Sequence, residues 1–284
     1  MTYDFKSTCI QGTRFRDMAN YVLRDGSTDL VHYPERQEGK YPVLYSHTHD
    51  FATLCQHASK FPGKVTLITH NSDGGVRATN RRAYDADPSL LPSNIRYWYA
   101  QNVEVPLKDY PIIPIPIGLE NRYCFDYDKA EMLFKERWSQ YRGSARHTMY
   151  LNCNISTNPV ERSEIYKICA DLPHVNIKHG SNGFEYKEYL HDIQMNDMVI
   201  SPRGNGLDCH RTWETLYMDR TPILKYSEGM STWKLPIVFV DSWEELKDFE
   251  LIKQKDYEAF EKFWGETDHI NIHYWRDRIL NENT

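Results

Sequence analysis

The chain lacks the features that would place it among secreted disulfide-rich proteins, zinc ribbons or membrane proteins. Its 284 residues include six cysteines, none of which forms a C-x-x-C pair, and this usage is typical of free thiols in a reducing compartment. No window approaches the length of a membrane span, and the opening segment "MTYDFKSTCIQGTRF" has no apolar signal-peptide core. We therefore expect a cytoplasmic protein with no membrane span.

Positive charge is also scarce. The 34 Lys and Arg against 40 Asp and Glu give a net charge of -6, so we expect no nucleic-acid partner. Neither G-x-G-x-x-G nor a P-loop sequence occurs, which leaves out the two commonest glycine-rich nucleotide fingerprints. Aromatic residues, by contrast, reach 13%; this suits stacking on sugar rings, although tyrosine-rich cores have the same composition.

Short apolar, β-branched runs alternate with helical patterns in two series along the chain. The first series predicts strands at 29–33, 41–46, 64–70, 94–100 and 112–118. The second predicts strands at 148–154, 175–180, 197–202, 221–226 and 237–241. Helices are expected at 50–60, 159–171, 184–195 and 208–218. Such alternation predicts parallel sheets covered on both faces.

Two series of this kind predict an α/β protein with two doubly wound, Rossmann-like domains that face a cleft. We place the first domain at residues 1–122 and the second at 123–262, and we expect 263–284 to form a C-terminal helix that packs back on the first domain. Ligands of such sheets bind outside the carboxyl ends of the strands. The loops after the strands are therefore the candidate site.

The most informative of these loops opens the stretch "SPRGNGLDCHRTWETLYMDRTPIL", residues 201–224. Gly204 and Gly206 permit positive φ and a close backbone approach, and Asp208 is the expected N-cap of the following helix. A glycine-rich turn that opens a helix directs free N–H groups at its mouth, which suits an anion such as a diphosphate.

Charged side chains in this stretch extend that reading. Arg203 and Arg211 would add charge-assisted donors to a diphosphate, and Glu214 would accept hydrogen bonds from ribose hydroxyls. The alternative is an ordinary loop that needs glycines, with Arg211 and Glu214 forming an i,i+3 ion pair.

Residues 201–224 as a whole resemble the signature of exostosin-like glycosyltransferases. In that signature a Ser-Pro-x-Gly-x-Gly-x-Asp run leads into an Arg-x-x-Glu helix and an apolar Pro-Ile strand. The stretch looks most like the short, soluble members from large algal DNA viruses and some bacteria, which would place it in the host cytoplasm if viral. One departure is Asp219-Arg220, where members often have glycine before the strand.

The resemblance implies a GT-B fold, a UDP-sugar donor in the second domain and inversion at the anomeric carbon. It places Arg211 at the diphosphate and Glu214 at the ribose. UDP-xylose is the favoured donor because the group includes pentose transfer, and the acceptor would be a glycan or glycoprotein. We expect no metal cofactor, because arginines and a helix N-terminus would stabilise the leaving diphosphate.

Other strand-end residues join the expected donor site. Arg162, in the first turn after strand 148–154, is a second candidate diphosphate ligand, and its alternative is an exposed surface arginine. His179 is expected to border the base, with an ordinary loop as the alternative. The remaining donor candidates belong to the glycine-rich turn itself: Ser201, Pro202 and Asn205.

An inverting transferase also needs a base that deprotonates the acceptor hydroxyl. Asp73 is the first candidate, because the adjacent Gly74-Gly75 lets a substrate approach closely. His47 and His49, after the strand at 41–46, are the alternative bases.

Two other classes of protein stay open. His47-x-His49-Asp50 resembles the first part of H-x-H-x-D-H, a metal-ligand pattern of hydrolases, for which His70 and His179 would supply further ligands. The last histidine of that pattern is missing, since residues 51–52 are Phe-Ala. A non-catalytic nucleotide- or glycan-binding protein would have the same fold.

Overall fold

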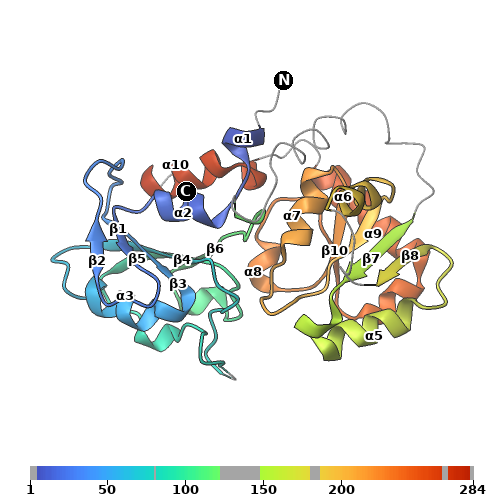
Figure 1. Cartoon of the computed structure of the whole chain (residues 1–284), viewed down its shortest axis with the longest axis horizontal. Helices are drawn as coiled ribbons and strands as arrows, with labels where there is room; N and C mark the ends of the chain where they lie inside the picture. Colours follow the sequence, from blue (N-terminus) through green and yellow to red (C-terminus); the bar gives the residue numbers. More distant parts are fainter. Residues whose placement is uncertain (1–4, 80, 122–147, 180–185, 264–267, 282–284) are drawn as a thin grey trace.

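The computed structural model describes residues 5–79, 81–121, 148–179, 186–263 and 268–281. It is an α/β structure with two sheets, each flanked by helices (Figure 1). The predicted fold class is therefore confirmed at this level, and the arrangement is consistent with two Rossmann-like domains. We refer to the parts built on the two sheets as the first and the second half.

The first sheet has six strands in the order β2-β1-β3-β4-β5-β6. Their bounds are β1 (Tyr21–Leu23), β2 (Leu30–His32), β3 (Val43–His47), β4 (Val65–His70), β5 (Ile95–Ala100) and β6 (Ile112–Pro114). The expectation of a fully parallel sheet is wrong at one edge, where β1 pairs antiparallel with β2. A short turn joins these two strands as a hairpin, which leaves no room for a crossover helix.

Helices cover the first sheet on both faces. The apolar side chains of β3 alternate, so Val43 and Tyr45 pack with α2 (Gly12–Asp17) and with α10 (Ile272–Asn281). Leu44 faces the other way, toward α3 (Phe51–Ala58). Only one short helix, α1 (Phe5–Thr8), precedes these elements in the described residues.

The second sheet is parallel throughout, in the order β11-β10-β9-β7-β8. Its strands are β7 (Met149–Cys153), β8 (Val175–His179), β9 (Met198–Ile200), β10 (Thr221–Lys225) and β11 (Val238–Val240). Helices α6 (Tyr186–Gln194) and α7 (His210–Tyr217) bury their apolar faces against one side of this sheet. Helices α5 (Pro159–Cys169) and α9 (Phe249–Phe263) cover the other side.

Short elements complete the architecture. Helix α8 (Glu228–Ser231) follows β10 and contacts β6 of the first half. The 3-10 turns are η1 (Thr48–Asp50), η2 (Pro88–Leu90), η3 (Leu107–Asp109), η4 (Ile155–Thr157), η5 (Trp243–Lys247) and η6 (Asp268–Ile270).

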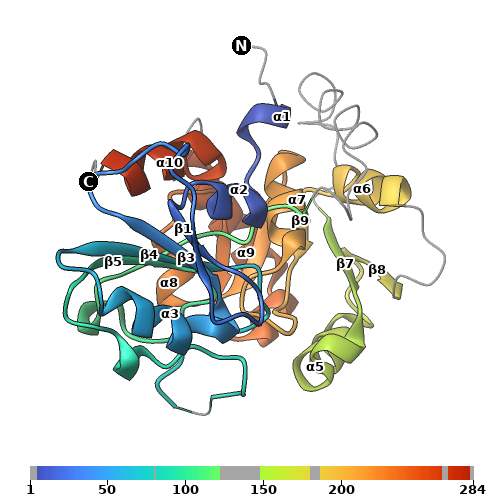
Figure 2. The same cartoon turned by 60° about the vertical axis from the view of Figure 1, so that its left-hand side comes forward.

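The last helix leaves the second half and lies against the first sheet (Figure 2). The amide of Lys40 donates to the carbonyl of Leu280 at 2.9 Å, and the Tyr99 hydroxyl donates to the carbonyl of Arg278 at 3.0 Å. Tyr217 of α7 adds a connection, since its hydroxyl accepts from the amide of Ile10 at 2.8 Å. One apolar core therefore runs through elements of both halves.

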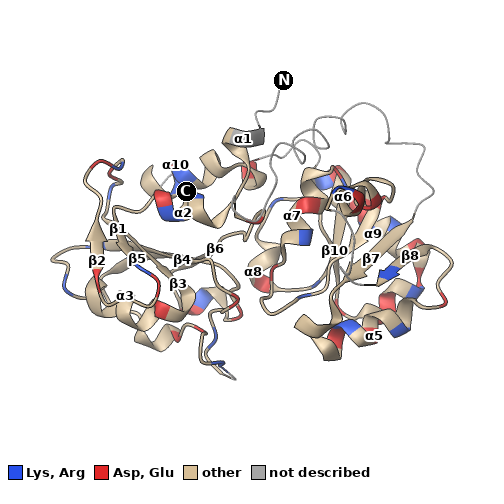
Figure 3. Cartoon of the chain, viewed as in Figure 1, with Lys and Arg blue, Asp and Glu red and all other residues tan. Residues whose placement is uncertain are grey.

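All the strand segments predicted from the sequence contain strands, although 112–118 is reduced to Ile112–Pro114. The five cysteines in the described part of the chain are free, and Cys209 is only half-buried; Cys124 lies outside that part. Lys and Arg lie interspersed with Asp and Glu over both halves (Figure 3). None of the helices in the described residues has the length and apolarity that crossing a membrane requires.

Candidate functional site

The loop from β9 to α7, residues 201–210, lies against the first half. Asn102, just after β5, is the main contact, since its side-chain oxygen accepts from the amide of Asp208 at 2.8 Å. Asp208 is itself buried, and its carboxylate accepts from the amide of Ile117 at 2.9 Å and from the Trp213 indole at 2.8 Å. These bonds fix the loop between the two halves.

The role expected for the two loop glycines is wrong in part. Among the described glycines only Gly26 and Gly118 have positive φ, so Gly204 and Gly206 do not serve a left-handed turn. Both positions require glycine because other side chains approach the backbone closely there. A Cβ on Gly206 would lie 2.6 Å from the Asn102 amide nitrogen, and one on Gly204 would lie 3.0 Å from the Arg162 guanidinium.

Asp208 does not cap α7, contrary to the sequence prediction. The N-cap is Cys209, which makes no side-chain capping bond. The Asp208 carboxyl instead points between the halves, where burial raises its pKa to about 6 against the opposing hydrogen bonds from Ile117 and Trp213. Asp208 therefore has a structural role, because its hydrogen bonds hold the loop to the first half.

A cavity of about 450 Å³ opens in front of this loop, with walls from both halves. Its volume lies in the range of small-molecule sites. The predicted site residues that line it are Asp73, Arg162, Gly204, Asn205, Gly206, Asp208, Arg211 and Glu214. We call this cavity the Arg211 pocket.

Arg211 gives the pocket its unusual electrostatics. Its Nε and Nη1 atoms are buried and have no hydrogen-bond partner in the part of the chain that the structure describes. Burial lowers the pKa of the guanidinium, but surrounding groups that include Tyr189 and Glu214 outweigh this effect and raise it. The pocket therefore holds a guanidinium whose charge the surroundings favour but whose Nε and Nη1 groups lack the hydrogen bonds that a ligand could supply.

Glu214 lies one turn further along α7 and is buried. The alternative of an i,i+3 pair is not what the structure shows, since no ion pair joins Glu214 to Arg211 within the described ranges. The two carboxylate oxygens accept instead from two tyrosines of α6, from the Tyr186 hydroxyl at 3.0 Å and the Tyr189 hydroxyl at 2.8 Å. These tyrosines also line the pocket.

Arg162 is neither an exposed arginine nor a free diphosphate ligand. It is buried, and its guanidinium donates to the carbonyls of Arg203 at 2.9 Å, Asn154 at 2.6 Å and Pro202 at 3.3 Å. A charged group that satisfies three backbone oxygens holds the glycine-rich loop to the start of α5. Arg162 thus shapes the pocket wall.

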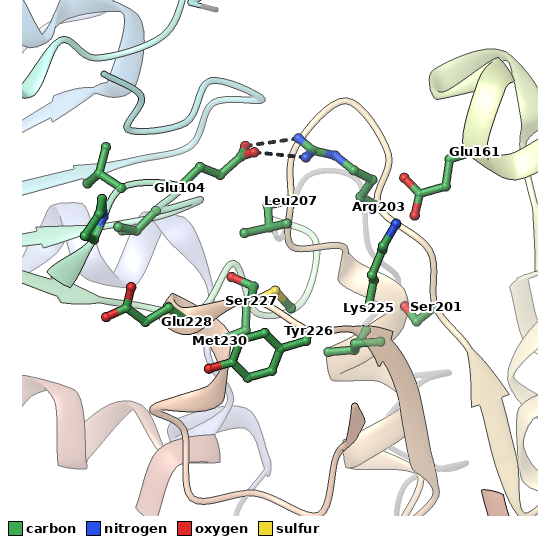
Figure 4. Close-up of a pocket in the computed structure, with 15 residues that line it drawn as sticks. Glu104, Glu161, Ser201, Arg203, Leu207, Lys225, Tyr226, Ser227, Glu228 and Met230 are labelled. Atoms are coloured by element: carbon green, nitrogen blue, oxygen red, sulfur yellow. Dashed lines mark hydrogen bonds and ion pairs between the residues drawn. The ribbon is translucent and has the colours of Figure 1, made fainter. Parts of the chain in front are cut away.

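Arg203 lies on the opposite side of the loop, in a separate cavity of about 470 Å³ (Figure 4). Its two terminal nitrogens contact the two oxygens of Glu104, each at 3.0 Å, in a bidentate pair that joins the halves. Ser201 also lines this second cavity, and its hydroxyl bonds that of Thr212 at 3.0 Å. Arg203, Ser201 and Pro202 are not among the residues that line the Arg211 pocket.

His179, expected near a base, is exposed at the end of β8 and does not line the Arg211 pocket. Its ring stacks on Tyr166 with 4.8 Å between the ring centroids. Its position follows from β8 being the edge strand of the second sheet.

Asp73, the first candidate base, reaches the Arg211 pocket from the first half. It is exposed, and its carboxylate accepts from the side-chain amide of Asn205 at 3.1 Å. Arg82 bridges the same two residues, donating to the carbonyl of Asn205 at 2.6 Å and to that of Asp73 at 3.1 Å. A first-half carboxylate is thereby held against the glycine-rich loop at the pocket.

His47 and His49 lie in a different place, and neither lines the Arg211 pocket. They contact Asp25, a residue that the sequence did not bring forward, with Nδ1 of His47 at 3.2 Å and Nε2 of His49 at 2.7 Å from the same carboxylate oxygen. The hydrogen bond from His49 is the main cause that holds the pKa of Asp25 below its usual range. Asp50 completes the group.

His70 does not join this cluster as a ligand. Its Nε2 bonds the carbonyl of Pro116 at 2.9 Å and its Nδ1 accepts from the amide of Asn71 at 2.7 Å, so both ring nitrogens are in use. The residue is fully buried, and burial lowers its pKa to about 4.

Several residues that line the pocket were not predicted, among them Tyr186, Tyr189 and His210. His210 opens α7 and lines the pocket. Its Nδ1 donates to the carbonyl of Gly118 at 2.7 Å, and its Nε2 lies 3.4 Å from the Glu120 carboxylate. The only feature of the sequence that could have indicated His210 as a pocket residue is its position next to Arg211 in the "LDCHRTWE" run.

Comparison with known proteins gives no match, either to a protein-family model or to a curated protein sequence. The features of the chain that bear on its function are therefore the residues of the Arg211 pocket and the 201–224 stretch, which supplies many of them.

Proposed function

We propose that the protein is an inverting glycosyltransferase of GT-B architecture. It would move a sugar from a UDP-sugar, with UDP-xylose as the best candidate, to a hydroxyl of a glycan or glycoprotein acceptor. The observation that carries the proposal is Arg211, whose Nε and Nη1 are buried without partners in a pocket between two sheets. A diphosphate carries negative charge and acceptor oxygens, and it could therefore accept hydrogen bonds from this guanidinium.

The donor is proposed to lie with its diphosphate against Arg211 and the first turn of α7. Negative charge builds on the leaving diphosphate in the transition state, and a fixed cation together with backbone N–H groups stabilises it there. In this account they supply what a divalent ion supplies in other transferases. Arg162 acts indirectly, by holding the loop on which the diphosphate rests.

Glu214 is proposed to bind the ribose. Since Tyr186 and Tyr189 donate to its oxygens in the described structure, a ribose hydroxyl would replace one of these donors or bridge to it. The two rings then border the nucleoside and offer it apolar surface.

Asp73 is proposed as the general base. The acceptor oxygen attacks the anomeric carbon as the bond from that carbon to the diphosphate oxygen breaks. The hydroxyl proton goes to the Asp73 carboxylate, and UDP leaves with the bonding electrons. Attack opposite the leaving group inverts the anomeric centre, and Asp73 is the carboxylate that the first half contributes to the lining of the pocket.

A metal-dependent hydrolase is the second candidate, since two histidines and two aspartates do meet near His47. It is the weaker one for two reasons. None of the four lines the Arg211 pocket, and four protein donors leave no open position for a reactive water on a tetrahedral ion.

A screen of nucleotides and nucleotide sugars by thermal shift, with and without EDTA, tests the proposal. A ligand that binds only the native state raises the melting temperature. We expect UDP and one UDP-sugar to stabilise the protein equally in both buffers, and that sugar then to be transferred to a glycan acceptor. No response to any nucleotide would contradict the proposal.

A further inference from the structure

Two turns at one end of the first sheet bring together side chains that are far apart in the sequence. Asp25 follows β1, while His47 ends β3 and is followed by His49 and Asp50 in η1. Because β1 and β3 are parallel neighbours, the chain segments that leave them start at the same edge of the sheet. One donor atom from each of the four residues lies within 4.8 Å of the others.

The separations between these donor atoms are close to those around a small tetrahedral ion. Zinc bonds to His nitrogen and carboxylate oxygen measure about 2.0–2.2 Å, which places neighbouring ligand atoms about 3.3–3.6 Å apart. The His47 nitrogen lies 3.2 Å from the Asp25 oxygen, and the His49 nitrogen lies 2.7 Å from Asp25 and 3.5 Å from Asp50. Shifts of less than about 1 Å would suit an ion at the centre.

The surroundings also fix the donors. The amide of Gly26, next to Asp25, donates to the Asp50 carboxylate at 3.3 Å, so the two turns already contact each other. The rings of His47 and His49 lie edge to face, at 74° with 5.3 Å between their centroids. The hydrogen bond from Gly26 orients the Asp50 carboxylate, as outer-shell partners orient ligating carboxylates in metal sites.

We propose that Asp25, His47, His49 and Asp50 bind one divalent transition-metal ion of the zinc type. Two imidazoles and two carboxylates form a donor set that suits such an ion in tetrahedral geometry. The site is closed and structural, and it fastens the turn between β1 and β2 to the turn that leads into α3. It is separate from the Arg211 pocket and does not rest on the proposed transferase activity.

Metal-stripped protein is the material for the test. It is titrated with Zn²⁺ in competition with a chromophoric chelator, and with Co²⁺ while the visible d–d bands are recorded. We expect one equivalent of either ion, a tetrahedral Co²⁺ spectrum and a higher melting temperature with Zn²⁺. His49→Ala and Asp25→Asn should each weaken binding more than about tenfold.

Matched controls come from the same hairpin. His32 and Asp29 are exposed residues of the first half, so His32→Ala and Asp29→Asn should bind Zn²⁺ as the wild type does. Thermal melts in EDTA show that each variant folds, and Asp50→Asn replaces any that does not. Uptake of no ion, or equal uptake in the site and control variants, would overturn the proposal and leave the cluster as hydrogen-bonded ion pairs.

Discussion

The two cavities on either side of the 201–210 loop are alike in size, at about 450 and 470 Å³, and each contains an arginine from the same stretch. In one of them Arg203 donates to both oxygens of Glu104, a carboxylate that also pairs with Arg77. In the other, Arg211 keeps buried N–H groups without partners. Arg203 thus has its terminal nitrogens hydrogen-bonded to a side chain, whereas two N–H groups of Arg211 have no hydrogen-bond partner in the described residues and could be satisfied by an anion.

Arg162 supplies a third case, since it donates to three backbone carbonyls and to the Cys209 sulfur. Three arginines around one loop thus differ in their hydrogen bonds. Arg203 bonds a carboxylate, Arg162 bonds mainly the main chain, and Nε and Nη1 of Arg211 bond none of the described residues. Counting basic residues near a glycine-rich turn cannot separate these cases.

The largest effect is expected at Asp73. Asp73→Asn should leave UDP binding intact and lower the rate of transfer by about 10²–10⁴, the usual contribution of a general base. Turnover measured with saturating donor checks this. His49→Ala, outside the pocket, is the comparison; if it abolishes transfer while Asp73→Asn retains it, the base lies in the histidine cluster.

Arg162→Ala should reduce the free energy of unfolding by about 3–4 kcal/mol, because it removes charge-assisted bonds and leaves buried carbonyls without donors. Urea unfolding measures this. Arg203→Ala breaks a partly exposed pair and should cost only about 1 kcal/mol. Equal losses in the two variants would contradict the distinction drawn between these arginines.

Arg211→Ala should weaken UDP binding by about 2–4 kcal/mol, since a charged partner of the diphosphate is lost. The same change removes no hydrogen bond from Nε or Nη1 to the described residues, but it removes a charge that Glu214 favours, so the ligand-free variant should melt only slightly lower than the wild type. Calorimetric titration and thermal melts measure the two effects. A much lower melting temperature with unchanged UDP affinity would show that Arg211 is a structural residue.

The smallest effect concerns Asp208 and pH. Its folded pKa of about 6 lies above the unfolded value, so its contribution to stability is present below about pH 4 and is lost as pH rises through 6. His70 and His269, with pKa values lowered by burial to about 4, act oppositely and destabilise the fold as pH falls from about 6.5.

Asp208→Asn keeps an acceptor oxygen at this position but replaces the titratable carboxyl group with an amide that does not titrate. The variant should therefore lose stability more steeply than the wild type between pH 6 and 4, by at most about 3 kcal/mol for a shift of two units. Urea unfolding across this range measures the difference, and Asp29→Asn is the exposed control. Parallel profiles for all three proteins would refute the buried titration.

The sequence predicted the strands and most helices because their signals are local. β4 reads as one apolar run and is buried at every position, as a central parallel strand should be. β1 was missed since three residues carry no periodicity. The loop glycines were placed correctly for a partly wrong reason, because Asn102, which requires close approach at Gly206, lies over a hundred residues away.

The same limit applies to the candidate site. The pairing of Arg203 with Glu104, and of His49 with Asp25, depends on how strands from distant segments are ordered. Arg162 looked like a surface side chain because its partners are carbonyls some 40 residues further on. Residue types near strand ends indicate where a site lies, but only the fold shows which charges are already matched.

The most direct test of the central claim is a calorimetric titration of the wild-type protein with UDP and with uridine, both in EDTA. The account predicts one UDP site and much weaker binding of uridine, because the diphosphate meets the unmatched Arg211. Equal affinities for the two ligands, or no binding of UDP, would contradict it.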